Sequence, residues 1–154
     1  MNNLERLWAI EEIKQLKARY FRYLDTKKFQ DLRQVFSADA VFDVSDAMRD
    51  PVTGTPPGAI EIPRMSGLEN IVAGIAEVLG SAQSVHHGHM AEIDVTSLGT
   101  ATGIWSMEDI VLTDEFQLRG YGHYHETYEK TAEGWRIKTL KLTRLRATVE
   151  QANR

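Results

Sequence analysis

The hydrophobic pattern of this chain changes near residue 84, and that change narrows the possible folds sharply. Before it, apolar residues recur at helical spacing, most clearly over residues 3–25. After it, apolar and polar residues alternate as in strands, over residues 84–95, 100–112, 116–130 and 134–147. Helices segregated from strands predict an α+β fold, with a curved antiparallel sheet wrapped over the helices and a pocket between them.

Two helices and one short strand are expected near the start of the chain. The first helix covers residues 3–25, and Asn2 followed by Glu5 is a start signal. The second helix covers residues 29–36. A short strand, residues 38–44, follows it.

Residues 45–65 interrupt this regular pattern. They contain all four prolines of the chain, so we expect a long irregular loop. Loops of this length in compact domains are often lids over pockets. Ser66 and Glu69 then form a capping box, which predicts the start of a third helix.

Length, charge and composition exclude several classes of function. A chain of 154 residues favours a single domain, residues 1–154. The net charge of -4 comes from interspersed acidic and basic residues, so we expect no nucleic-acid partner. The absence of cysteine excludes thiolate chemistry and agrees with a cytoplasmic location. The sequence contains neither a membrane-length apolar run nor a phosphate-binding glycine loop, so we expect no membrane or nucleotide partner and no cofactor.

All five histidines lie in two of the predicted strands. Side chains alternate along a strand, so His87 and His89 share one face while His86 points to the other. His123 and His125 likewise share a face. The spacing allows the latter two to meet His87 and His89 around a metal ion, and exposed strand positions are the alternative. Because the sequence contains no recognised zinc motif, we predict no metal site.

Three candidate residues lie near the end of the first predicted helix. Tyr20 and Tyr23 can pack half-buried with their hydroxyl groups reaching water. Asp25 can cap the helix or belong to the turn that follows it. Taken alone, these structural interpretations are sufficient for all three residues.

Further candidates lie in two of the later strands. Asp109 shares the strand parity of Trp105 and Met107, and a carboxylate on such a face requires a partner or a wet pocket. Arg144 and Arg146 are two residues apart in the last predicted strand, so we expect both side chains on one face. Taken alone, a solvated charged edge is a sufficient interpretation for both arginines.

Several segments resemble SnoaL-like proteins of the nuclear transport factor 2-like superfamily. The opening of such proteins is similar to RYFRYLDTKKFQDLRQVFSADAVFD, and their strands are similar to VHHGHMAEI, TATGIWSMED, GHYHETYEKTAEGWRI and LTRLR. The likeness spans about residues 8–147. It implies a cone of three N-terminal helices packed on a curved antiparallel sheet. Members include dehydratases, isomerases, cyclases, epoxide hydrolases and non-catalytic binders, so the fold alone does not give the activity.

The pattern of polar residues is similar to that of bile-acid 7α-dehydratases and, more loosely, of scytalone dehydratase. This resemblance implies catalytic roles for Tyr20, Asp25, His86 and Asp109. His86 is expected to be a general base oriented by Asp109. Tyr20 is expected to polarise a substrate carbonyl and Asp25 to be an auxiliary acid. The substrate-binding residues expected are Tyr23, Trp105, Met107, Tyr124, Arg144 and Arg146.

Two functions remain open. The first is a cofactor-independent lyase or isomerase, similar to a dehydratase, that acts on a hydrophobic cyclic or polycyclic carbonyl compound by His-Asp proton abstraction. The second is a non-catalytic domain of the same fold that binds a small ligand or supports an assembly. In both cases we expect a homo-oligomer, because the outer face of the sheet carries apolar and histidine side chains, and the resemblance implies that it is a dimer or a trimer.

Overall fold

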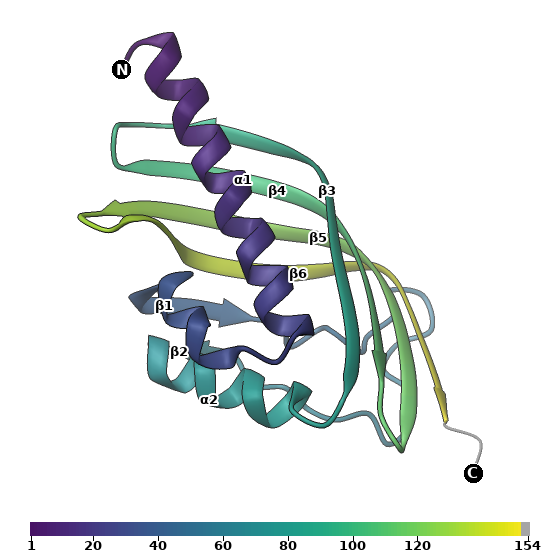
Figure 1. The fold of residues 1–154 in the computed structure, drawn as a ribbon. Coiled ribbons are helices and arrows are strands. Elements are labelled where there is room, and N and C mark those ends of the chain that lie inside the picture. The colour runs from purple at the N-terminus through teal and green to yellow at the C-terminus, as the bar shows by residue number, and fades with distance from the viewer. Residues whose placement is uncertain (152–154) are drawn as a thin grey trace.

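A computed structural model describes residues 1–151 of the chain. Helices pack on one face of a single six-stranded sheet, which curls around them (Figure 1), and the predicted α+β class is confirmed. The elements in chain order are α1 (Asn3–Asp25), the 3₁₀ helix η1 (Phe29–Gln34), β1 (Phe36–Asp43), β2 (Met65–Ser66), α2 (Leu68–Leu79), β3 (Gln83–Val95), β4 (Thr100–Leu112), β5 (Phe116–Thr131) and β6 (Gly134–Gln151). No helix within the described residues is long and apolar enough to cross a bilayer.

The strand order of the sheet is β2-β1-β6-β5-β4-β3. Strands β3 to β6 form the predicted antiparallel meander, while β1 pairs with β6 in parallel. Strand β3 is therefore an edge, and its outer row of backbone N–H and C=O groups has no strand partner. This open edge lies beside α1 (Figure 1).

Helix α1 begins where the sequence predicts. Asn2 Oδ1 accepts from the Glu5 backbone N–H at 2.8 Å, and Glu5 Oε2 accepts from the Asn2 N–H at 2.7 Å. The predicted apolar stripe is buried only further along the helix. Leu4, Leu7 and Trp8 are exposed because the first turns of α1 extend beyond the sheet (Figure 1).

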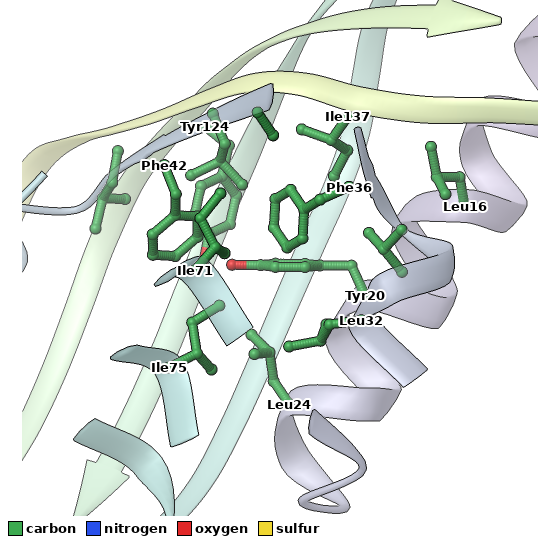
Figure 2. Packing of buried hydrophobic residues seen from close by; sticks show 14 of the residues in the cluster. Leu16, Tyr20, Leu24, Leu32, Phe36, Phe42, Ile71, Ile75, Tyr124 and Ile137 are labelled. Atoms are coloured by element: carbon green, nitrogen blue, oxygen red, sulfur yellow. The ribbon is translucent and has the colours of Figure 1, made fainter. Parts of the chain in front are cut away.

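The core lies between α1, α2 and the concave face of the sheet. Figure 2 shows Tyr20 within it, lying beside Phe36 with its hydroxyl directed towards Tyr124. The Tyr20 and Phe36 rings meet edge to face, with 5.9 Å between their centroids. Burial of an aliphatic or phenylalanine side chain of this core contributes about 1.5–3 kcal/mol. The core thus fixes Tyr20 on a rigid part of the molecule.

The second predicted helix is shorter than expected. It is the 3₁₀ helix η1, and β1 starts at Phe36 instead of residue 38. The cause is parallel pairing with β6, in which Phe36 lies opposite Ile137 and the Ile137 N–H donates to the Val35 carbonyl at 2.8 Å. Pairing with a distant strand outweighs the local helical preference here.

The predicted capping box at Ser66 is wrong. Ser66 belongs to β2, where it pairs with Val41, and its side chain does not cap the helix. Helix α2 begins after Gly67, whose φ of 85° lies in the left-handed region that glycine tolerates. Glu69 forms an ion pair with Arg33 of η1.

The expected irregular loop is present, although its predicted last residue, Met65, belongs to β2. Asp50 attaches it to β6, because Asp50 Oδ2 accepts from the Ala147 N–H at 3.0 Å. Backbone N–H groups of Thr53, Ala147 and Val52 together lower the pKa of Asp50 to about 2. The loop is thereby fastened next to the last strand, where it closes one end of the cone.

Candidate active site

A largely apolar cavity of about 80 Å³ lies under α2 and the 45–65 loop. The loop contributes Ala47, Met48, Ile60 and Ile62 to its wall, in agreement with the expectation that this segment covers a pocket. Only four of the lining side chains carry hydroxyl, imidazole or carboxyl groups. They are Tyr20, His86, Asp109 and Tyr124.

His86 reaches this cavity from the edge strand β3 and is paired with Asp25. His86 Nδ1 lies 2.7 Å from Asp25 Oδ1, and the His86 backbone N–H donates to Asp25 Oδ2 at 2.8 Å. Asp25 is the last residue of α1, so it occupies the open edge of the sheet and satisfies an N–H that has no strand partner. One carboxylate thus holds both the backbone and the ring of His86.

A second group steadies the Asp25 carboxylate. The Ser84 hydroxyl donates to Asp25 Oδ1 at 3.0 Å and accepts from Lys27 Nζ at 2.9 Å. Partial burial on its own would raise the pKa of Asp25. The hydrogen bonds from His86 and Ser84 outweigh it and hold that pKa below its usual value. Asp25 is therefore a carboxylate, suited to accept the Nδ1 proton of His86.

The predicted pairing of His86 with Asp109 is wrong. The two residues are opposite one another in the β3–β4 register, yet the Asp109 carboxylate is held by Arg144 of β6. Arg144 Nη1 and Nη2 lie 2.7 and 3.0 Å from the two Asp109 oxygens, and Nε donates to the Ala47 carbonyl at 2.8 Å. A bidentate guanidinium–carboxylate pair is stronger than a neutral hydrogen bond to an imidazole.

Gly120 of β5 makes this pairing possible. It lies opposite both Asp109 and Ala147 in the sheet, so the Arg144 side chain crosses β5 directly over it. A Cβ atom at this position would overlap the Arg144 guanidinium and the Asp109 carboxylate. Because Gly120 has no side chain, Arg144 of β6 has room to reach Asp109 of β4.

The expectation that Arg144 and Arg146 share a face is also wrong. Tyr121 pairs with Arg146 and Gly122 with Arg144, so Leu145 is an extra residue that forms a β-bulge. The bulge reverses the alternation. Arg144 is buried, with 1% of its side chain exposed, whereas Arg146 is exposed beside the 45–65 loop.

Tyr20 and Tyr124 bring two hydroxyl groups to the cavity wall. Their rings are 6.2 Å apart, and both residues are at most 2% exposed. Burial raises the pKa of each phenol well above its usual value, and nearby carboxylates contribute to the rise. Both tyrosines are therefore protonated at neutral pH and can donate hydrogen bonds into the cavity.

The chain matches the family model of the SnoaL-like domain over residues 5–141. It belongs to the SnoaL-like family. The family assignment and the cone fold expected from the sequence are thereby confirmed.

Proteins similar to this SnoaL-like chain match it along most of their length. A protein described as probable cyclase FGR4 of Gibberella zeae is 26% identical over 137 residues, which cover 86% of this chain and 89% of that protein. A scytalone dehydratase-like protein of Novosphingobium aromaticivorans has a TM-score of 0.74 at 19% identity, covering 96% and 91% of the two chains. The hexachlorocyclohexane dehydrochlorinase LinA-type3 of Novosphingobium barchaimii has a TM-score of 0.75 at 16% identity, covering 97% and 94%.

Three residues predicted to line the pocket lie behind its wall. Trp105 donates from Nε1 to the Tyr128 hydroxyl at 2.9 Å, deeper in the core. Met107 contacts Arg144 through its sulfur atom at 3.4 Å. Tyr23 packs under the Arg22 guanidinium, 4.8 Å from its ring centroid. Strand parity and helix face correctly place all three side chains inward, but the cavity is too short to reach them.

The sequence interpretation missed the buried Lys17. It forms an ion pair with Glu126 of β5, and its Nζ lies 4.1 Å from the Tyr20 ring centroid and 3.8 Å from that of Tyr124. Burial lowers the pKa of Lys17 to about 8, and the Glu126 carboxylate limits the fall. A signal was present, because Lys17 is three residues before Tyr20 and so lies on the apolar face of α1.

Proposed function

We propose that this SnoaL-like protein is a cofactor-independent lyase or isomerase, related in action to dehydratases and cyclases, whose substrate is a hydrophobic cyclic carbonyl compound. The observation that carries the proposal is the His86–Asp25 pair, which opens on an apolar cavity beside two phenol hydroxyl groups. The described actions of the relatives, a cyclase and a dehydrochlorinase, support the same class of chemistry.

The pair is arranged for removal of a proton. Asp25 accepts the Nδ1 proton of His86, which fixes the tautomer in which Nε2 carries the free lone pair. Within residues 1–151 no protein group hydrogen-bonds to Nε2, so this nitrogen is available as a general base. Once Nε2 has taken a proton, the Asp25 carboxylate stabilises the resulting imidazolium.

The tyrosines provide the complementary charge stabilisation. Removal of a proton next to a carbonyl places negative charge on the carbonyl oxygen, and hydroxyl donors of Tyr20 or Tyr124 can stabilise that enolate. In a dehydration, the proton held on His86 Nε2 then passes to the departing hydroxyl, which leaves as water. In an isomerisation, the same proton returns to another carbon of the substrate. Both sequences balance without a metal or a redox cofactor.

Asp109 has a different role from the one expected. Its two oxygens accept hydrogen bonds from Arg144, which fixes the carboxyl group in the cavity wall. Asp109 lines the cavity, so its carboxylate can accept a hydrogen bond from a hydroxyl group of the substrate. We therefore assign Asp109 to substrate positioning and Asp25 to orientation of the base.

The shape of the cavity limits the substrate. A volume of about 80 Å³ holds several water molecules or part of a small ring system. A polycyclic compound fits only if the loop side chains Ile60 and Ile62 move outward. The loop therefore controls the size of substrate admitted, and its apolar side chains favour a ring over a charged group.

Hydrogen–deuterium exchange tests the proposal without knowledge of the natural substrate. The bicyclic ketone 2-tetralone is incubated with the protein in D₂O, and loss of its α-proton signals is followed by NMR. His86→Gln and Asp25→Asn are expected to slow the catalysed exchange by about 100-fold or more, the contribution of a positioned base. His125→Gln, an exposed histidine on the outer face, is the matched control and is expected to keep the wild-type rate.

Ligand affinity separates catalysis from simple binding. Line broadening of the ketone signals is measured for the same four proteins. An enzyme loses exchange in the His86 and Asp25 variants while retaining affinity. If the wild-type protein binds the ketone and catalyses no exchange above the rate in buffer, the alternative of a non-catalytic binding domain is correct.

A further inference from the structure

The outer face of the sheet carries a histidine cluster that the candidate active site does not use. His87 and His89 project from β3 on the side opposite His86, as strand alternation requires. Glu108 of β4 is the cross-strand partner of His87 and projects to the same side. These three side chains are separated from the cavity by the full thickness of the sheet.

Their ligand atoms converge on one point. His87 Nδ1 lies 3.2 Å from Glu108 Oε1, and His89 Nε2 lies 4.0 Å from the same oxygen. One ligand atom from each residue lies within 4.8 Å of the others. Ligand atoms around a tetrahedral zinc ion stand roughly 3.3 Å apart, as zinc–nitrogen bonds of about 2.0–2.1 Å require. Small rotations of partly exposed side chains close the remaining difference.

The backbone beneath the cluster is held firmly. Gly88, between the two histidines, lies against the Phe21 ring of α1 so closely that a Cβ atom there would be 2.7 Å from it. Met90, which follows His89, has a φ of 40° and belongs to a β-bulge opposite Trp105. Left-handed backbone at a residue other than glycine is costly and is kept where the surroundings impose it. The bulge ends the regular alternation directly after the second histidine.

Although the sequence alone predicts no metal site, we propose that His87, His89 and Glu108 bind a divalent transition-metal ion of the zinc type on the outer face of the sheet. Two imidazoles and one carboxylate form a donor set that zinc prefers, and it leaves a fourth position for water. The three side chains are between 44% and 56% exposed, so an ion reaches them directly from solvent. This site is independent of the chemistry proposed for the cavity.

Zinc titration by calorimetry tests the site directly. The full chain is freed of metal with a chelator, exchanged into chelator-free buffer and titrated with Zn²⁺. We expect one ion per chain, and His87→Ala, His89→Ala and Glu108→Gln are each expected to weaken binding by at least about tenfold. His125→Gln is again the matched control, because His125 lies on the same face and contacts Thr143 instead of the cluster.

The cobalt complex provides a second readout. Co²⁺ bound by two imidazoles and a carboxylate in a four-coordinate site gives a visible absorption band that is lost in the His87→Ala and Glu108→Gln variants. Absence of stoichiometric Zn²⁺ binding would overturn the proposal. So would binding that persists unchanged in the His87→Ala and His89→Ala double variant, or binding that is lost in His125→Gln.

Discussion

Two buried ion pairs lie on the inner face of the sheet, and they differ in their surroundings: one lies at the cavity and the other is enclosed in the core. Asp109 and Arg144 lie at the cavity, and Asp109 forms part of its wall. Lys17 and Glu126 are enclosed completely, with 1% and 0% of their side chains exposed. The second Glu126 oxygen accepts from the Tyr128 hydroxyl, so neither of its oxygens is left for a ligand.

The inner face of the sheet therefore supports the core in one region and forms the wall of the candidate active site in another. The enclosed pair joins α1 to β5 directly beneath the rings of Tyr20 and Tyr124, and so fixes the two phenols that reach the cavity. The pair at the cavity fixes the Asp109 carboxylate in the wall, where a ligand can contact it. We therefore expect the enclosed Lys17–Glu126 pair to affect mainly stability and the Asp109–Arg144 pair to affect mainly binding.

Removal of the enclosed carboxylate is expected to have the largest effect. Glu126→Gln leaves the Lys17 ammonium without a counter-charge in the core, and loss of one partner of a buried pair costs about 3–5 kcal/mol. The free energy of unfolding is measured by urea denaturation. Glu129→Gln is the matched control, because Glu129 is a partly exposed residue of the same strand. A loss below about 1 kcal/mol would show that Lys17 is neutral in the folded protein.

The pH dependence of stability tests the same pair. Lys17 has a pKa of about 8 in the folded chain, against an ordinary value of 10.5 once the chain unfolds, so between these values the unfolded chain binds more protons. Stability should therefore rise with pH, by roughly 2 kcal/mol between about pH 8 and 10. From about pH 9 upward the tyrosines oppose the rise, because burial raises the pKa of Tyr20, Tyr124 and Tyr128 and the unfolded chain loses their protons first.

A double variant isolates the contribution of Lys17 to this curve. Lys17→Met with Glu126→Gln removes both charges and retains an acceptor for the Tyr128 hydroxyl. Urea denaturation of this variant at several pH values is expected to show no rise between about pH 8 and 10. An unchanged rise would assign the effect to other groups.

Strand alternation predicts which face a side chain occupies, and the structure agrees for His86, His87 and His89. It does not predict which partner a side chain selects. The His86–Asp25 contact depends on β3 being the edge strand and on where α1 ends, and neither follows from local pattern. The extra residue Leu145 reverses the parity of Arg146, and such bulges leave little trace in composition.

Gly120 connects the pair at the cavity to the sheet, and a methyl group there should break it. Gly120→Ala places a Cβ atom against Arg144 and Asp109, and overpacking of this kind costs about 2 kcal/mol. Gly99→Ala is the matched control, because an added Cβ there meets nothing within 4 Å. Urea denaturation and the affinity for 2-tetralone are measured together. The Gly120→Ala variant should lose both stability and ketone affinity. Retention of affinity would place the ligand away from Asp109.

Asp109→Asn should affect stability least, and this separates the two ion pairs most directly. Arg144 keeps its bond to the Ala47 carbonyl, and the amide oxygen of the substituted side chain can still accept from the guanidinium at the border of the cavity. We expect a loss of about 1 kcal/mol, the scale of one hydrogen bond, against the larger loss in Glu126→Gln. Ketone affinity should fall in Asp109→Asn and remain unchanged in the fraction of Glu126→Gln that is folded. Equal losses of stability in the two variants would mean that the position of Asp109 at the cavity makes no difference and that both pairs are mainly structural.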